Sequence, residues 1–146
     1  MKNILIPIDG SEFGDRAVEI GKLFAKAFNS NVVLLNVPHV VFPVYAYGYG
    51  VAMLDNPYEI YKRAQDESAE LLTSVKRSFG EMSDKVEIIS LKGNASEAII
   101  DYINANNFDL IIMGSHGLGA ILNRLLLGSV TTKVLHHVKT PVLVVK

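Results

Sequence analysis

The chain has 146 residues, of which 49% are hydrophobic and 20% are charged. This length is typical of one domain, and a domain of about 150 residues buries roughly 70% of its unfolded surface, so we expect a hydrophobic core without covalent cross-links. The absence of cysteine excludes disulfides, thiolate metal sites and cysteine nucleophiles. The 14 basic and 15 acidic residues leave a net charge of -1, which argues against nucleic acid binding through the phosphate backbone.

The first residues suggest no targeting or membrane segment. Met1-Lys2-Asn3 leads into an apolar run that Pro7 and Asp9 interrupt, and this run is too short for the core of a signal peptide. No segment approaches the roughly 20 apolar residues of a membrane helix. We therefore expect a cytoplasmic protein with no membrane partner.

Five short apolar runs predict five β-strands. They are rich in Ile, Val and Leu and are mostly continuous rather than alternating, which is typical of strands covered by helices on both faces. The runs cover residues 3–8, 31–37, 86–91, 109–113 and 142–145. Glu87 and Ser90 interrupt the third run, which predicts a position nearer an edge of the sheet.

Four segments between these runs predict helices. Ser11, Asn56 and Asn94 are typical N-cap residues, and apolar residues recur behind them at helical spacing. The fourth helix is expected to follow Gly128-Ser129. The spacing also predicts inward-facing residues, among them Phe28 at the end of the first helix and Tyr61 near the start of the second.

The alternation of strands and helices predicts a single doubly wound α/β domain, residues 1–146. Its five-stranded parallel sheet would carry helices on both faces. Ligands of such open sheets bind beyond the carboxyl ends of the strands, where the strand order reverses. The loops after Ile8, Val37, Leu91 and Met113 are therefore the candidate site.

Glycines gather directly after the fourth predicted strand. Gly114-Ser115-His116-Gly117-Leu118-Gly119 follows Met113, and Gly128-Ser129 opens the last helix. Glycine lets backbone N–H groups approach a ligand, and a helix N-terminus adds unpaired N–H groups and the positive end of the helix dipole. The series therefore predicts an anion cradle, with phosphates as the favoured ligand. The alternative is that these glycines form ordinary turns.

Two other phosphate-binding motifs are excluded. No Gly-Lys-Ser/Thr follows the glycines, so the series is not a Walker loop. The dinucleotide fingerprint would follow the first strand, where Asp9-Gly10-Ser11 stands instead.

These residues resemble the nucleotide-binding branch of the universal stress protein family. The resemblance rests on Gly114…Gly117…Gly128-Ser129, on the strands before and after that series, and on Ile-Leu-Ile-Pro-Ile-Asp-Gly-Ser at residues 4–11. It covers the whole chain. The family pattern is Gly-x2-Gly-x9-Gly-Ser/Thr, whereas this chain has ten residues, 118–127, where nine are usual. We expect the additional residue to bulge near Gly119.

The resemblance implies a Rossmann-like fold of the adenine nucleotide alpha hydrolase type that binds ATP, with Mg²⁺ or Mn²⁺ as an accompanying ion. Asp9 would bind the ribose or lie near a phosphate-bound metal. Pro7 and Ile8 would line the nucleoside pocket, and Val37 and Met113 would present backbone groups to adenine. The ribose and phosphates would be surrounded by Gly114, His116, Gly117, Gly128, Ser129, Val130 and Thr131.

The residues alone leave alternatives open at two of these positions. Asp9 could form a turn or cap the following helix, and His116 could be a solvated loop residue. No motif lysine or dedicated base accompanies the cradle, which favours binding over catalysis. The first hypothesis is an ATP-binding regulator that acts as a nucleotide-dependent dimeric switch. The alternatives are a slow ATP hydrolase or nucleotidyl transferase, and a nucleotide-free interaction module.

Two further segments predict interactions. An open apolar edge strand invites association, and for residues 142–145 the resemblance implies a homodimer with these strands paired antiparallel. Residues 38–56 form a segment longer than most loops, with aromatic residues among small ones. This segment predicts a lid over the nucleotide or a surface for a protein partner. The alternative is an ordered flap that buries its own aromatic residues.

Overall fold

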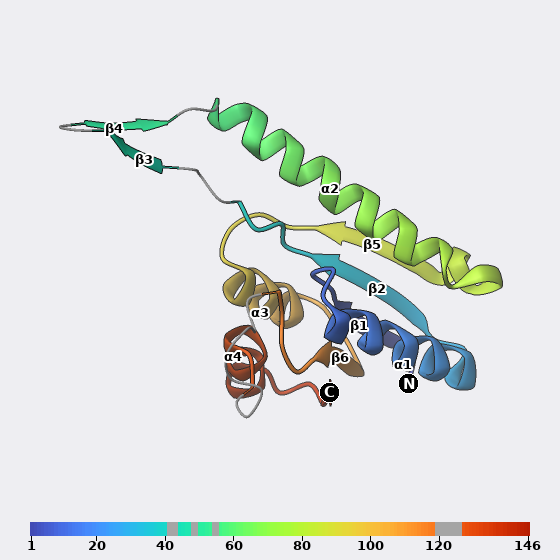
Figure 1. The fold of residues 1–146 in the computed structure, drawn as a ribbon. Helices are drawn as coiled ribbons and strands as arrows, with labels where there is room; N and C mark the ends of the chain where they lie inside the picture. The colour runs from blue at the N-terminus through green and yellow to red at the C-terminus, as the bar shows by residue number, and fades with distance from the viewer. Residues whose placement is uncertain (41–43, 48–49, 54–55, 119–126) are drawn as a thin grey trace.

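The computed structural model describes residues 1–40, 44–47, 50–53, 56–118 and 127–146. A five-stranded sheet in the order β5-β2-β1-β6-β7 forms its centre (Figure 1). Every neighbouring pair in this sheet is parallel, and β5 lies at an edge, as its polar interruptions predicted. The five predicted strands are confirmed as β1 (Asn3–Pro7), β2 (Asn31–Asn36), β5 (Val86–Ser90), β6 (Leu110–Gly114) and β7 (Val142–Val145).

The helices begin where the sequence predicted. Ser11, Asn56 and Asn94 cap the first three, each with a side-chain oxygen that accepts a hydrogen bond from an N–H group in the first turn. No helix in the described part of the chain is both long and apolar enough to cross a bilayer. The helices are α1 (Glu12–Phe28), α2 (Pro57–Arg77), α3 (Ala95–Ala105) and α4 (Ser129–His137), with a short 3-10 helix, η1 (Gly80–Lys85), after α2.

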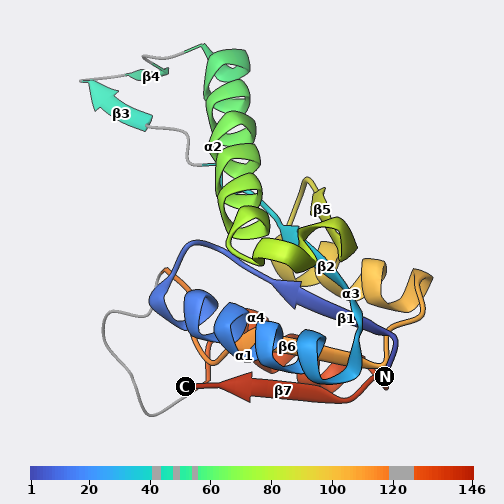
Figure 2. The same ribbon diagram turned by 90° about the vertical axis from the view of Figure 1, so that its right-hand side faces the viewer.

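Two hydrophobic clusters fill the space between the sheet and its helices. Side chains alternate along a strand, so Ile4 and Ile6 of β1 face α1 and α2, whereas Leu5 faces α3 and α4. All three are fully buried. Figures 1 and 2 show the helices on the two faces of the sheet, with β7 along one edge. The doubly wound architecture is therefore confirmed.

Two aromatic residues that were predicted to face the core are exposed, so the prediction was wrong for them. Phe28 is 53% exposed and Tyr61 is 47% exposed. The ring of Phe28 packs on Phe24 at the end of α1, with 6.0 Å between ring centroids. The first turns of α2 extend beyond the sheet (Figure 1), so the first buried residue of this helix is Ser68. Helical spacing predicts which residues share one face of a helix, but it does not show how far the sheet extends beneath that face.

The segment 38–56 contains a β-hairpin where the sequence analysis predicted a loop. β3 (Val44–Tyr47) pairs antiparallel with β4 (Gly50–Met53), and Figure 1 shows both apart from the main sheet. Each strand has only four residues and glycines stand beside them, so no apolar run is long enough to predict a strand. Residues 41–43, 48–49 and 54–55 lie outside the described residues. The lid or partner surface stays a prediction.

Asp109 ties the start of β1 to the start of β6. Its Oδ2 accepts hydrogen bonds from the N–H groups of Asn3 at 2.9 Å and Lys2 at 2.5 Å. These two bonds, that of Asn3 first, hold the pKa of Asp109 below its ordinary value of 3.8. A carboxyl group whose pKa is lower in the folded than in the unfolded chain stabilises the fold above the unfolded pKa. That stability is lost as the pH falls through the folded pKa.

We therefore expect Asp109→Asn to lower the melting temperature at pH 7 and to lower it much less near pH 2. As the pH falls through the folded pKa of Asp109, the wild-type carboxyl takes up a proton as well, so the two proteins then differ less. Differential scanning calorimetry at both pH values measures the effect. Asp66→Asn on the exposed surface of α2 is a matched control and should show no such pH dependence. An equal loss for Asp109→Asn at both pH values would contradict the prediction.

Candidate functional site

The strand order reverses between β1 and β6, which are neighbours in the sheet. The chain leaves β1 toward β2 on one side and leaves β6 toward β7 on the other, so the two exit loops diverge and form a crevice between them. Asp9 lies in the loop after β1, and the series that starts at Gly114 leaves β6. The structure therefore brings the two strongest sequence signals to the same point of the fold.

Asp9 connects the two loops. Its Oδ1 accepts a hydrogen bond from the N–H of Ser11 at 3.0 Å, and its Oδ2 accepts one from the N–H of Leu118 at 3.0 Å. A β-carbon at Gly117 would lie 2.6 Å from the same Oδ2, so glycine is what lets the loop approach the carboxylate. Asp9 thus forms the turn that the sequence analysis left open as an alternative to ligand binding, and it also holds the loop after β6.

Gly114 and Gly128 allow close contact between backbone segments. A β-carbon on Gly114 would lie 2.8 Å from the carbonyl carbon of Phe13, and one on Gly128 would lie 3.2 Å from the Cα of His116. The N–H of Gly128 donates to the carbonyl oxygen of Ser115 at 2.8 Å. Neither glycine, nor Gly117, has a positive φ. Close approach, rather than turn conformation, is therefore what requires glycine at these three positions.

Two buried hydroxyl groups form hydrogen bonds to groups of this loop. Ser115 is fully buried, and its Oγ lies 2.9 Å from Nδ1 of His116. Thr131 is also buried, and its hydroxyl donates to the carbonyl oxygen of Gly114 at 2.9 Å. The ring of His116 packs on that of Phe13, with centroids 5.0 Å apart. Thr131, predicted beside the phosphates, therefore directs its hydroxyl to the exit of β6, and Ser115 is a supporting residue that the sequence analysis did not identify.

The first turn of α4 presents N–H groups beside this loop. Gly128 is the N-cap, and the first helical hydrogen bond runs from the N–H of Thr132 to Gly128 at 2.9 Å. The N–H groups of Ser129 and Val130 precede that bond, and they lie at the positive end of the helix dipole. This arrangement suits an anion.

A cavity of about 460 Å³ adjoins the same turn of α4. Such a volume is within the range of small-molecule sites. Three residues predicted to contact the nucleotide, Val37, Ser129 and Val130, line it. Lys92 and Lys133 line it too, although neither was among the predicted site residues. Lys92 directly follows the end of a predicted strand, and this position was a signal that could have identified it as a site residue. No sequence signal places Lys133 beside Lys92.

Three predicted residues have buried side chains. Pro7, Ile8 and Met113 are buried at the ends of β1 and β6, and the side chains of Ile8 and Met113 belong to the two hydrophobic clusters. They could meet a ligand only through the backbone. Asn36, at the end of β2, is also buried, and its Nδ2 donates to the carbonyl oxygen of Ile8 at 2.8 Å. The predicted bulge near Gly119 lies outside the described residues.

Among the described residues, no group of three or more histidine, aspartate or glutamate side chains is arranged so that it could hold a metal ion. Asp9 fits a different arrangement. Mg²⁺ in nucleotide sites is usually held by one or two carboxylates together with the phosphates. A single carboxylate at the crevice meets that requirement only when a nucleotide supplies the remaining oxygen ligands.

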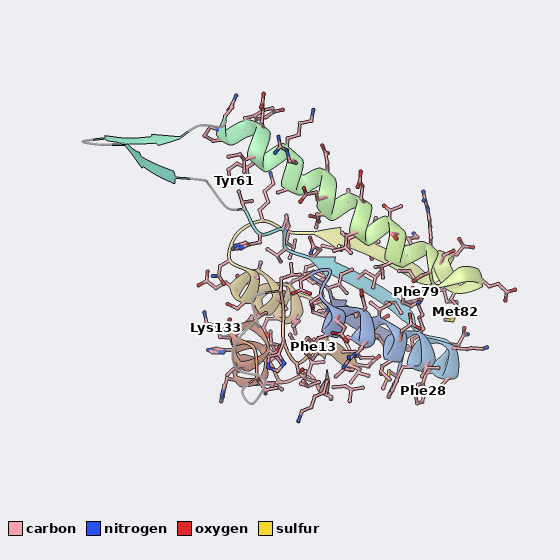
Figure 3. All side chains as sticks on the ribbon, in the orientation of Figure 1. Phe13, Phe28, Tyr61, Phe79, Met82 and Lys133 are labelled. Carbon is pink, nitrogen blue, oxygen red and sulfur yellow. The ribbon has the colours of Figure 1, made fainter. Side chains whose placement is uncertain are left out.

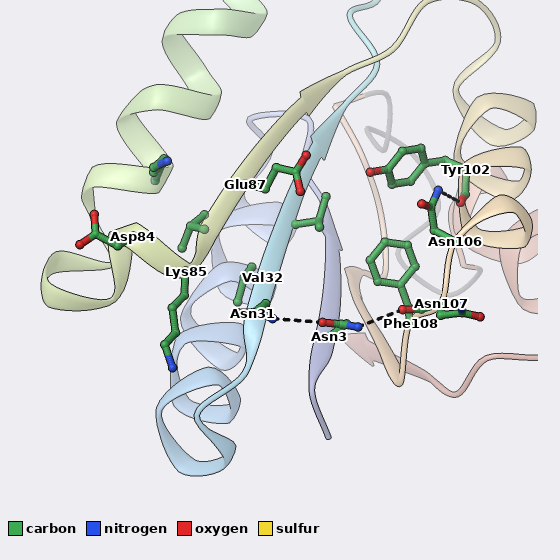
Figure 4. Close-up of a pocket in the computed structure, with 13 residues that line it drawn as sticks. Asn3, Asn31, Val32, Asp84, Lys85, Glu87, Tyr102, Asn106, Asn107 and Phe108 are labelled. Carbon is green, nitrogen blue, oxygen red and sulfur yellow. Dashed lines mark hydrogen bonds between the residues drawn. The ribbon is translucent and has the colours of Figure 1, made fainter.

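A larger cavity, of about 660 Å³, lies at the opposite edge of the sheet (Figure 4). It is lined by the first residues of β1, β2 and β5 and by the ends of α2 and α3, including Asn3, Lys76 and Asn106. The carboxyl ends of helices carry partial negative charge, so this edge disfavours a phosphate. The smaller cavity, beside a helix N-terminus and at the carboxyl ends of the strands, is the better candidate for an anionic ligand.

Comparison with known proteins identifies one family. The model of the Universal stress protein family matches residues 1–146. Universal stress protein MJ0577 of Methanocaldococcus jannaschii is 32% identical over 157 residues, covering 99% of this chain and 94% of the relative. Universal stress protein MJ0531 of the same organism is 31% identical over 150 residues, covering 99% of this chain and 82% of that protein.

Solved structures share the fold. The structure of MJ0577 has a TM-score of 0.77 with 29% identity and covers 99% of this chain and 95% of its own. A universal stress protein solved in complex with cAMP has a TM-score of 0.61 with 26% identity and covers 99% of this chain and 95% of its own. An Arabidopsis thaliana family member with AMP bound has a TM-score of 0.69, covering 100% of this chain and 92% of its own. Its identity is 16%, so that likeness concerns the fold alone.

Proposed function

The chain belongs to the universal stress protein family, and from this premise we propose that it binds adenine nucleotides, ATP in particular, at the carboxyl edge of its sheet. In this proposal the protein is a cytoplasmic regulator, and nucleotide binding switches its interactions in the dimeric state. Support for an adenine nucleotide comes from the relative solved with cAMP, which is 26% identical. Support for phosphates comes from the geometry of this chain.

The observation that carries the proposal is the meeting of Asp9 with the glycine loop beside the first turn of α4. The loop from Gly114 to Leu118 adjoins the first turn of α4, because the N–H of Gly128 donates to the carbonyl oxygen of Ser115, and the N-cap Gly128 has no side chain to cover the N–H groups of Ser129 and Val130. Backbone donors in such an arrangement bind phosphate without a motif lysine. The adjoining cavity, with Val37 and Val130 on its wall, would take the base.

A divalent cation would complete this site. Bound to the phosphates, Mg²⁺ or Mn²⁺ would neutralise part of their charge. Asp9 is the residue we expect to contact it, since its two oxygens each accept only one hydrogen bond from the described residues and a carboxylate can accept more.

Two measurements test nucleotide binding. Mass spectrometry of the denatured protein should detect adenine nucleotide that co-purifies with it. In an NMR titration with ATP and Mg²⁺, the amide signals of Gly117, Leu118, Ser129 and Val130 should shift. Those at the opposite edge of the sheet, such as Asn106, serve as the internal control and should not. Unmoved signals at all four positions with millimolar ATP would overturn the proposal.

We also propose a homodimer through β7. This strand is an edge of the sheet, and all four of its residues, Val142–Val145, are partly exposed. The carbonyl oxygens of Pro141 and Val145 accept hydrogen bonds from Ile111 of β6 and from Ser115 directly after it. By the alternation of a strand, those of Val142 and Val144 therefore face outward and are available to a second copy. Light scattering should give twice the 16.0 kDa of the chain. A mass of one chain at micromolar concentration would contradict the dimer.

A further inference from the structure

The larger cavity, at the amino ends of the strands, has a negative charge on the side that faces α3. Paired residues on neighbouring strands point to the same face of a sheet, and Glu87 of β5 is paired with Val33 of β2. Val33 packs on the hydrophobic cluster beside α3 and α4, so the carboxylate of Glu87 lies on that face too.

The other charged residues of this cavity come from the opposite face of the sheet. They are Lys76, Asp84 and Lys85. Lys76 belongs to α2 and the other two belong to η1. Both elements pack on the face of the sheet where Phe79 and Met82 lie (Figure 3). Glu87 is therefore the charged residue of the lining on the α3 side.

Two aromatic rings form the wall opposite Glu87 (Figure 4). Tyr102 of α3 and Phe108 after this helix pack on each other, with 5.9 Å between ring centroids, and both are partly buried. Burial raises the pKa of Tyr102, and the carboxylate of Glu87 raises it further. The negative charge of Glu87 therefore acts at the hydroxyl of Tyr102.

No described residue pairs with this negative charge. Glu87 forms no hydrogen bond or ion pair within the described part of the chain, where both ion pairs lie in α1. The ammonium group of Lys85 donates instead to oxygens of Asn29. The last turn of α3 has no basic residue, whereas those of α1, α2 and α4 each have at least one. The partial negative charge at the carboxyl end of α3 therefore adds to that of Glu87.

The groups on this side of the cavity suit an ammonium ion. The Nδ2 of Asn106 donates to the carbonyl oxygen of Tyr102 at 2.8 Å, and its Oδ1 accepts no hydrogen bond from the described residues. A carboxylate and an amide oxygen accept hydrogen bonds from an ammonium group, and the faces of aromatic rings attract it. Val33 and Phe108 offer apolar surface beside these groups, which suits a short alkyl chain. A metal ion fits less well, because the described residues contain no group of three acidic or histidine side chains that could hold it.

We propose that this side of the cavity binds a small aliphatic amine in its protonated form, with the ammonium group held between the carboxylate of Glu87 and the ring of Tyr102. The cavity volume of about 660 Å³ is within the range of small-molecule sites, which favours a free amine over a lysine side chain of another protein. The site lies at the opposite edge of the sheet from the glycine loop, so this inference does not depend on nucleotide binding.

NMR titrations of the full chain with n-butylamine test the site, with n-butanol as the neutral probe of the same length. An aliphatic amine has a pKa of about 10, as the lysine side chain does, so it is protonated at pH 7. The amide signals of Tyr102 and Asn106 should shift, whereas those of Gly117 and Ser129 should not. The amine should bind at least tenfold more tightly than the alcohol. That ratio corresponds to about 1.4 kcal/mol, which one hydrogen bond to a charged group supplies.

Three variants test the two walls. In Glu87→Gln, which keeps the shape of the side chain and removes its charge, the ratio of the two affinities should fall below about three. Glu70→Gln, on the exposed surface of α2, removes the same charge away from the cavity and should leave the ratio unchanged. Tyr102→Leu removes the ring and should weaken the amine by about two- to fivefold, as expected of an exposed cation–π contact.

The outcomes separate an amine site from other uses of the cavity. Equal affinities for the amine and the alcohol would mean that the cavity is merely apolar, and an unchanged ratio in Glu87→Gln would mean that the carboxylate does not bind the ammonium group. Displacement of the amine by Mg²⁺ at a lower concentration would indicate a metal site. Each of these results would overturn the inference. None of them affects ATP binding, which the signals of the glycine loop report separately.

Discussion

Replacing Gly114 with alanine is expected to lower the free energy of unfolding by about 2 kcal/mol, in the range typical of over-packing. The new β-carbon would lie 2.8 Å from the carbonyl carbon and from the Cβ of Phe13, and 2.9 Å from its carbonyl oxygen. These atoms belong to the first turn of α1 and cannot rotate away, so the helix or the end of β6 must shift. Urea denaturation followed by circular dichroism measures the loss.

Gly80→Ala separates this steric effect from the ordinary cost of removing a glycine. Gly80 has a φ of +58°, and a β-carbon added there would have no atom within 4 Å, so alanine costs only the left-handed conformation, about 1–2 kcal/mol. Gly114 has no positive φ, so its loss must come from contact with α1. A Gly114→Ala variant that unfolds at the wild-type urea concentration would show that α1 and β6 do not pack as described.

Replacing Gly117 with alanine is expected to weaken ATP binding at least tenfold while leaving most of the stability intact. The β-carbon would lie 2.6 Å from Oδ2 of Asp9, and the carboxylate can avoid it only by rotating away. That rotation breaks the 3.0 Å bond to the N–H of Leu118 and releases the loop that offers its N–H groups to the phosphates. Hydrogen bonds to charged groups contribute about 1.5–3 kcal/mol, which corresponds to tenfold or more in affinity. Calorimetric titration with ATP measures the change.

A double variant tests whether this effect acts through Asp9. Asp9→Ala removes the atom that the new β-carbon would meet, so adding Gly117→Ala to it should reduce the affinity little further. Such non-additivity is expected of residues in direct contact. Fully additive losses would mean that Gly117 contributes to binding independently of the carboxylate. A Gly117→Ala protein that binds ATP like the wild type would contradict the role of the loop itself.

Most of the fold was predictable because its signals are local. A buried parallel strand appears as a short apolar run, and a helix start appears as a capping residue before a periodic segment, so the strands of the main sheet and the caps at Ser11, Asn56 and Asn94 follow from neighbouring residues. The prediction was wrong where the signal is weak or depends on distant structure. The four-residue strands β3 and β4 lack a long apolar run, and Tyr61 is exposed because α2 extends beyond the sheet.

The candidate site was only partly predictable, for a related reason. The glycine series indicated an anion cradle, yet residue type alone could not assign the hydroxyl of Thr131 to the carbonyl oxygen of Gly114. It also could not show that the side chains of Ile8 and Met113 belong to the core. These roles depend on which face of a strand or helix is covered, and only packing decides that.

The sequence by itself determined the types and order of the elements of the main sheet, and it predicted the carboxyl edge as the place of the candidate site and the residues expected to offer backbone donors there. Local periodicity, capping and the conformational freedom of glycine are enough for that much. Only the tertiary structure decided that Asp9 meets Leu118, 109 residues away, and that Lys92 and Lys133 share one cavity. Those contacts exist because β6 pairs with β1 and α4 packs beside α3, and long-range pairing of this kind leaves no trace in the spacing of neighbouring residues.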